Sequence, residues 1–348
     1  GGVVCKFRSI IERTCRYTKR CEHEANCKTN PGLHRLYTIY TIYDLVKTLQ
    51  RELPSLTAPL ARFKLIYDTL AGIQEFLMAD FLSDADFDQY RKLIYDESGI
   101  TFSTTNRAIL ESRLRERLRE KQISHIQDYY SLLLKDKEEL KLMLDSVTTN
   151  LTRFFRNQPH FDALEHYVLP EVLKLKKEKR DTKIRVWSAG CSTGEEPYTL
   201  AMILRDKLPS GYTSEIVASD LSLKSLLVGK SGFYPDSRMT GVPDAYLNRF
   251  FERKNNGYQV KDELMKMIRF DYHNLKHDSG LRNIDILFCR NVLIYFDEPA
   301  QKAVIDRFWD AMAPKSYLFI GHSESLFGMK TKFEFLKTDW ACLYQKNT

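Results

Sequence analysis

The stretch Arg185-Val-Trp-Ser-Ala-Gly-Cys-Ser-Thr-Gly-Glu-Glu-Pro-Tyr198 decides the fold class of this chain. Its apolar start predicts a buried strand over 184–188, and Pro197, which suits a first helical turn, predicts a helix to residue 207. Between them, Gly190 and Gly194 let the backbone approach a ligand closely. A strand, a small-residue turn and a helix in this order are typical of a nucleotide-like ligand site in an open α/β sheet.

The chemistry of this turn favours a cationic ligand over a phosphate. The turn has no P-loop lysine, and Glu195-Glu196 stands where a pyrophosphate would need positive or neutral groups. Carboxylates suit ribose hydroxyls and positive charge, and S-adenosylmethionine offers both, because its sulfonium and ammonium groups are cationic. The alternative is that the two glutamates only complement the helix dipole.

Asp220 is the second acidic candidate. It ends a predicted strand over 215–219 and lies 26 residues beyond Gly194. An acidic group at this position can bind the ribose hydroxyls of a nucleoside. An aspartate at a strand end can also be a helix N-cap, and the neighbouring glycine turn favours the ribose role.

Alternating strand and helix patterns follow the turn and predict a parallel sheet with helices on both faces. A charged run over 174–183 is expected to be a solvated linker after a helix over 161–176. Residues 234–269 interrupt the alternation with a predicted hairpin around Asn256-Gly257. The further strands are predicted at 284–289 and 317–321, the helices at 224–229 and 300–311, and a terminal antiparallel pair at 333–336 and 341–345.

Residues 83–150 carry a helical pattern, which predicts a small all-helical domain. Its second helix, predicted over 106–121, bears Arg107, Arg113, Arg115, Arg117 and Arg119. Arg113 and Arg117 are four residues apart and therefore share a face. This basic surface can dock an acidic partner or can be a solvated face paired with neighbouring glutamates.

Residues 1–77 differ from the rest of the chain. They contain no methionine before Met78 and hold 12 basic and 7 acidic residues, which leaves 41 and 39 for the remainder. Four of the seven cysteines, Cys5, Cys15, Cys21 and Cys27, lie here without the close spacing of structural zinc sites. We expect an extension of unknown role, non-native or from a mis-called start, and no metal site.

Bulk properties exclude several classes of protein. The net charge of +7 lies mostly in the first 77 residues, so the near-neutral remainder argues against a nucleic-acid partner. We find no long apolar run and no signal sequence, and we therefore expect a cytoplasmic protein without membrane insertion.

Three motifs give the chain a specific resemblance. The glycine turn, Thr148-Thr-Asn-Leu-Thr-Arg-Phe-Phe-Arg156 and Phe288-Cys-Arg-Asn-Val-Leu-Ile-Tyr-Phe-Asp297 resemble the CheR family of chemotaxis-receptor glutamate methyltransferases. The resemblance covers nearly everything after Met78. It implies a helical receptor-docking domain (78–157) and a Rossmann-like α/β methyltransferase domain (158–348) with a small β-subdomain at about 234–269.

The resemblance also assigns site residues. The implied contacts to S-adenosylmethionine are Asn150, Thr152, Arg156, Glu196, Asp220, Asn274, Leu275, Arg290 and Asn291. Arg290 and Tyr295 are expected to orient the substrate as catalytic residues. Several of these residues have an alternative role. Asn150 can be a helix cap, and Leu275 and Tyr295 can be ordinary core residues. Arg290 can belong to a structural ion pair. His322 in Gly-His-Ser-Glu-Ser is expected to pack against the sheet's end.

The implied activity is transfer of a methyl group to glutamate side chains of chemotaxis receptors, a protein-glutamate O-methyltransferase reaction. The implied partners are the cytoplasmic methylation helices of methyl-accepting receptors, docked through Arg107, Arg113 and Arg117, with the enzyme recruited to membrane receptor arrays. The turn at 253–258 is short, so no tether to a receptor's C-terminal pentapeptide is expected. The alternatives are another S-adenosylmethionine-dependent methyltransferase, or a non-catalytic adaptor.

Overall fold

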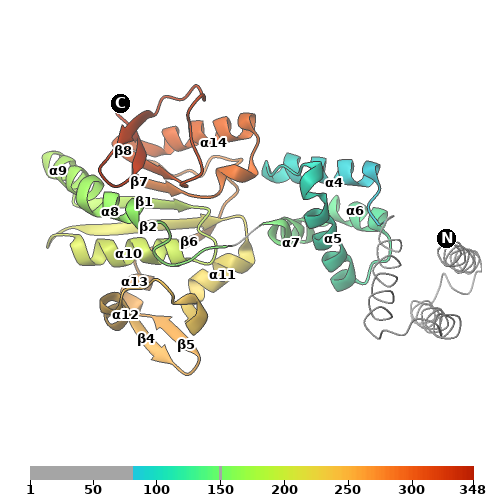
Figure 1. Ribbon diagram of the computed structural model, residues 1–348, viewed down its shortest axis with the longest axis horizontal. Helices are drawn as coiled ribbons and strands as arrows, with labels where there is room; N and C mark the ends of the chain where they lie inside the picture. The colour runs from blue at the N-terminus through green and yellow to red at the C-terminus, as the bar shows by residue number, and fades with distance from the viewer. Residues whose placement is uncertain (1–80, 149–150) are drawn as a thin grey trace, which may run out of the picture. The chain divides into compact units, whose positions relative to one another are not determined.

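The computed structural model describes residues 81–148 and 151–348, a helical part followed by an α/β part (Figure 1). The predictions for residues 1–77 and for Asn150 lie outside these ranges. Within them, no helix has the length and apolar character needed to cross a membrane.

The helical part consists of four helices that surround one apolar core. The first begins at a capping box in which Ser83 and Asp86 bond each other's backbone amides, and it ends at Gly99 in the left-handed conformation. The fourth begins at Asp136, whose carboxylate accepts two backbone N–H groups. The helices are α4 (Asp84–Ser98), α5 (Arg107–Lys121), α6 (Ile126–Leu133) and α7 (Lys137–Val147), with a 3₁₀ turn at Thr104–Asn106 before α5.

The α/β part is built on a seven-stranded sheet in the order β6-β2-β1-β7-β8-β10-β9. The first five strands of this order are parallel, and β10 pairs antiparallel with both β8 and β9. The strands are β1 (Lys183–Ala189), β2 (Thr213–Asp220), β6 (Ile268–Tyr272), β7 (Ile284–Cys289), β8 (Met312–Ile320), β9 (Glu334–Lys337) and β10 (Cys342–Lys346). This arrangement confirms the Rossmann-like fold class and the terminal antiparallel pair.

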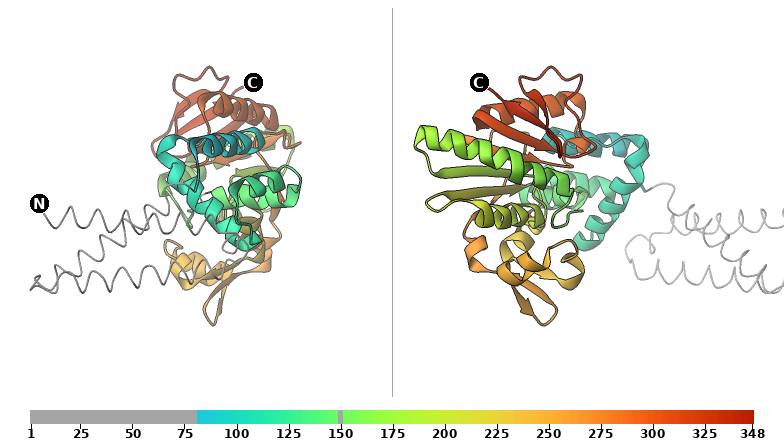
Figure 2. Two further views of the ribbon diagram at one scale, coloured as in Figure 1. Left: turned by 90° about the vertical axis from the view of Figure 1, so that its right-hand side faces the viewer. Right: turned by 60° about the vertical axis from the view of Figure 1, so that its left-hand side comes forward.

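Helices cover both faces of the sheet because successive strand residues point to opposite sides (Figures 1 and 2). Val186 belongs to a core with α10, while its neighbour Trp187 belongs to a second core with α14. The covering helices are α8 (Gln158–Ala163), a π turn (Leu164–Val168), α9 (Leu169–Lys179), α10 (Glu195–Lys207), α11 (Leu223–Ser231) and α14 (Glu298–Ala311).

A three-stranded antiparallel sheet, drawn in orange below the main sheet in Figure 1, forms the small β-subdomain. The predicted hairpin is present, but its two turn residues are 255–256, one position before the predicted Asn256-Gly257, and Gly257 already belongs to the following strand. Gly257 is required there, because an added Cβ would collide with the carbonyl oxygen of Tyr234. The elements are β3 (Phe233–Pro235), α12 (Asp244–Phe250), β4 (Phe251–Lys254), β5 (Gly257–Val260) and α13 (Asp262–Met265).

The expectation of a linker over 174–183 is wrong, although most of this run is exposed to solvent, as predicted. Helix α9 continues to Lys179, and β1 already begins at Lys183. Lys176 within this run is only 4% exposed, with its ammonium 2.7 Å from Asp181 and 2.8 Å from Asp285. The sequence pattern misled because both anionic partners come from outside the helix, one of them from β7.

Candidate functional site

The glycine turn closes the carboxyl end of β1 and is shaped by three left-handed residues. Gly190, Ser192 and Gly194 have φ angles of 78°, 49° and 94°. The amides of Gly190 and Cys191 donate to the carbonyl of Ser219 on β2, at 2.8 and 3.0 Å. An added Cβ at Gly190 would overlap the side chain of Val292, so glycine lets the loop after β7 pack directly against this turn.

Asp220, at the end of β2, holds the turn from the neighbouring strand. One carboxylate oxygen accepts the Ser192 amide at 2.7 Å and the other accepts the Ser222 amide at 2.8 Å. Burial raises the pKa of Asp220, and these amide hydrogen bonds oppose the rise. A carboxylate has about four lone-pair positions, so Asp220 keeps acceptor capacity for a ligand hydroxyl.

Glu196 and Arg290 form a buried ion pair that lines a cavity at the carboxyl ends of the strands. The Glu196 carboxylate accepts the Ser188 hydroxyl at 2.7 Å and the Arg290 Nε–H at 2.7 Å, with the two side chains 10% and 3% exposed. Arg290 also donates to the carbonyl of Arg156 at 2.6 Å and lies 3.2 Å from Nδ1 of His160. Arg290 thus forms the structural ion pair considered as the alternative, and it also lines the pocket.

His160 on α8 stays neutral beside this ion pair. Burial and the positive charge of Arg290 lower its pKa to about 4. A neutral ring can accept a hydrogen bond from the guanidinium, which a protonated ring could not do.

The Glu195 side chain binds different partners from those of Glu196. Its carboxylate accepts the Thr193 hydroxyl at 2.6 Å and the guanidinium of Arg238 at 3.0 Å, and its side chain is fully buried. The two glutamates of the turn therefore have separate environments, and only Glu196 lines the pocket.

The chain after β6 and the chain after β7 supply the opposite walls. Asn274 donates to the carbonyl of Glu97 at 2.6 Å, which joins this wall to the end of α4. Asn291 adopts a left-handed φ of 59°, and its side-chain oxygen is buried without a hydrogen-bond partner in the described residues. Tyr295, in the 3₁₀ turn Leu293–Tyr295, accepts the Thr101 amide at 2.8 Å through its carbonyl.

One cavity, with about 950 Å³ of space that includes its open mouth, brings these residues together. Every predicted cofactor-contacting residue within the described ranges lines it, as does Tyr295. Those residues are Thr152, Arg156, Glu196, Asp220, Asn274, Leu275, Arg290 and Asn291. Ser98, Ile100 and Val147 of the helical part close one side. The cavity lies at the carboxyl ends of β1, β2 and β7, where open α/β sheets bind ligands.

The lining fits S-adenosylmethionine in its chemistry. Two buried carboxylates suit hydroxyl and cationic groups, and Arg156 suits a carboxylate. The unpartnered oxygen of Asn291 is a further buried acceptor at this cavity.

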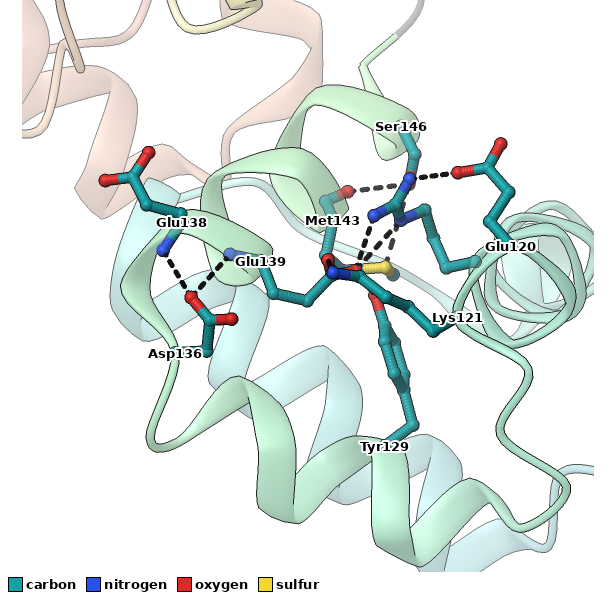
Figure 3. A network of polar contacts seen from close by, with 9 residues as sticks. Glu120, Lys121, Tyr129, Asp136, Glu138, Glu139, Met143 and Ser146 are labelled. Atoms are coloured by element: carbon teal, nitrogen blue, oxygen red, sulfur yellow. Dashed lines mark hydrogen bonds and ion pairs between the residues drawn. The ribbon is translucent and has the colours of Figure 1, made fainter.

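The arginines of α5 do not form one free basic face. Arg107 pairs with Asp84, and Arg113 lies 3.5 Å from Glu116 with its side chain 43% exposed. Arg117, by contrast, is only 9% exposed. It pairs with Glu120 and, at 2.6 Å, with Glu139 of α7. Glu139 also binds Lys121 and the Tyr129 hydroxyl at 2.7 Å each (Figure 3). This buried network is at odds with a docking role for Arg117.

Two residues near the cavity were missed by sequence reasoning. Glu324 accepts backbone amides of the loop after β7, although only His322 of its motif drew attention. His322 itself is exposed. His160 bonds Arg290 across 130 residues, and no local spacing could reveal that contact.

Comparison with known proteins agrees with the three motifs. Residues 85–148 match the family model described as "CheR methyltransferase, all-alpha domain", and residues 150–342 match "CheR methyltransferase, SAM binding domain".

Three relatives are named chemotaxis protein methyltransferase. The Borreliella burgdorferi protein is 35% identical over 267 residues, 74% of this chain and 92% of the relative. The Escherichia coli protein is 34% identical over 72% of this chain and 88% of the relative. The Pseudomonas aeruginosa protein, numbered 2 in its name, is 36% identical over 69% of this chain and 86% of the relative.

Proposed function

The chain belongs to the CheR family of chemotaxis protein methyltransferases, and from this premise we propose that it methylates glutamate side chains of chemotaxis receptors. Its α/β part is a domain for binding S-adenosylmethionine. The single observation that carries the proposal is the cavity that gathers eight family-matched residues at the strand ends. The product would be a glutamate methyl ester, which makes the chain a protein-glutamate O-methyltransferase.

The residues of the cavity divide into holding and orienting groups. Asp220, Glu196 and Arg156 would hold the cofactor through its hydroxyl, ammonium and carboxylate groups. When bound, S-adenosylmethionine supplies a methyl group activated by a positive sulfur. Arg290 and Tyr295 line the cavity at and beyond the end of β7, where they would orient the incoming side chain, while Asn291 would contact the cofactor.

The chain needs no general base for this reaction. A glutamate side chain has an unperturbed pKa near 4.3, so the nucleophile is already ionised at neutral pH. The work of the protein is therefore alignment and the exclusion of water. Ile100 and Val147 place apolar surface of the helical part against the cavity, which serves that exclusion.

The receptor would dock on the helical part through the arginines of α5 that remain exposed. Arg113 is half-exposed and Arg119 is exposed. They are six residues apart and so point about 120° away from each other around the helix, which means that each would contact a different part of the receptor. Arg107 can contribute where an acidic receptor helix displaces Asp84. Complementary charge steers such an encounter and sets its orientation. The β4–β5 turn is short, so we propose direct docking without a peptide tether.

The test is transfer of a tritiated methyl group from the cofactor to membranes that contain receptors. Label on receptor protein that mild alkali releases as methanol is the expected result, because carboxyl methyl esters are base-labile. Alkali-stable label would indicate a different methyl acceptor. Absence of label on any protein, with cofactor binding intact, would favour a small-molecule substrate or a binding-only role.

A further inference from the structure

The Gly-His-Ser-Glu motif after β8 contains a carboxylate that the proposed chemistry leaves unused. Glu324 accepts three backbone amides from two separate loops. One oxygen, Oε2, accepts the Asn291 amide at 2.9 Å and the Gly321 amide at 2.5 Å. The other, Oε1, accepts the Ile294 amide at 3.2 Å. Two of these donors, the amides of Asn291 and Ile294, lie in the segment 291–295, which places Asn291 and Tyr295 at the cavity.

The segment held by Glu324 begins with a left-handed residue. Asn291 adopts this conformation, which asparagine tolerates better than most residues with a side chain and which turns the chain sharply after β7. The Val292 side chain fills the space left by the missing Cβ of Gly190, so the segment lies directly against the cofactor turn. A shift of this segment would therefore move the wall of the cavity.

The close approach of the Glu324 carboxylate to the loop after β7 requires glycine at position 321. A Cβ at this position would lie 2.5 Å from Oε2 of Glu324 and 2.8 Å from the Asn291 amide nitrogen. No side chain fits between the two loops while they are joined in this way. The glycine and the carboxylate are thus two parts of one contact, which we call the Glu324 clamp.

We propose that Glu324 is a positioning residue for methyl transfer, which holds Tyr295 in the geometry that receives the substrate carboxylate and keeps Asn291 in place beside the cofactor. This inference rests on the function proposed above. The clamp does not touch Asp220, Glu196 or Arg156, which would carry cofactor affinity from other strands and loops. Loss of the clamp should therefore affect the transfer step more than cofactor binding.

The experiment compares Glu324→Gln and Gly321→Ala with the wild-type chain. Glu324→Gln keeps the side-chain shape but turns an NH₂ group towards backbone donors, and Gly321→Ala forces the carboxylate away. We expect kcat for receptor methylation to fall at least tenfold in both variants. The dissociation constant of S-adenosylhomocysteine should rise by a smaller factor than kcat falls, because Asn291 is one of eight predicted cofactor contacts. Glu178→Gln, an exposed glutamate on α9, is the matched control and should change neither value.

Hydrogen exchange gives a readout that does not depend on activity. The Asn291 and Ile294 amides should be protected in the wild-type chain and exchange at least tenfold faster in Glu324→Gln. Unchanged exchange at both amides would overturn the clamp, and so would a loss of S-adenosylhomocysteine affinity as large as the loss of kcat. If the wild-type chain fails to methylate receptors, the proposed function fails, while the exchange measurement still decides whether the clamp exists.

Discussion

Replacement of Glu139 by alanine is expected to destabilise the helical part severely. The Glu139 side chain is fully buried and is surrounded by Arg117 at 2.6 Å, Lys121 at 2.7 Å and the Tyr129 hydroxyl at 2.7 Å (Figure 3). Breaking a buried ion pair costs about 3–5 kcal/mol, and the loss here is expected at the lower end, because Arg117 keeps its pair with Glu120 and Lys121 is 36% exposed. Glu138→Ala, which removes only a surface pair with Lys141, should cost about 0–1 kcal/mol.

The assay is urea unfolding at pH 7, followed by circular dichroism. With a denaturant slope of about 2 kcal/mol/M, a loss of about 3 kcal/mol lowers the midpoint by about 1.5 M. If Glu139→Ala and Glu138→Ala shift the midpoint equally, the buried pair does not contribute as argued. Arg117→Met should resemble Glu139→Ala, because it breaks the same network from the other side.

The pH dependence provides a second check on Glu139. Burial opposes ionisation of this carboxyl, but the hydrogen bonds from Lys121, Arg117 and Tyr129 outweigh it and hold its pKa below the usual 4.5. A depressed carboxyl pKa stabilises the fold above about pH 4.5 and loses that contribution as the pH falls further. The difference in stability between wild type and Glu139→Gln should therefore shrink below about pH 4. A difference that stays constant to pH 3 would contradict this assignment.

Three further predictions concern the cofactor, the receptor and the extension. Asp220→Ala should weaken S-adenosylhomocysteine binding tenfold or more, about 1.4 kcal/mol by calorimetry, and equal affinity would remove Asp220 from the cofactor site. Arg113→Glu combined with Arg119→Glu should raise the Michaelis constant for receptors severalfold at low salt and leave cofactor affinity unchanged. Normal receptor kinetics in that double variant would show that the receptor binds another surface, most directly the β-subdomain. A chain that begins at Met78 should fold and retain methyltransferase activity, measured against the full chain. Loss of activity on this truncation would assign residues 1–77 a functional role.

The sequence by itself determined the parts of this protein that depend on local pattern. The glycine turn predicted β1, the start of α10 and a ligand site at the strand ends, because glycine and strand periodicity act over a few residues. Asp220 was found in the same way, by its place after a strand. The fold class followed from the alternation of strands and helices, which leaves few topologies open.

The tertiary structure alone decided which charged groups meet. Arg113 and Arg117 share a helical face by spacing, yet only Arg117 is buried, because α5 packs against α7 and brings in Glu139 from 22 residues away. Arg290 pairs with Glu196 across 94 residues, and Glu324 reaches Asn291 across 33. Such contacts depend on the order of strands in the sheet. The energy of a buried charge is set by its partners, so its role is decided only when the chain is folded.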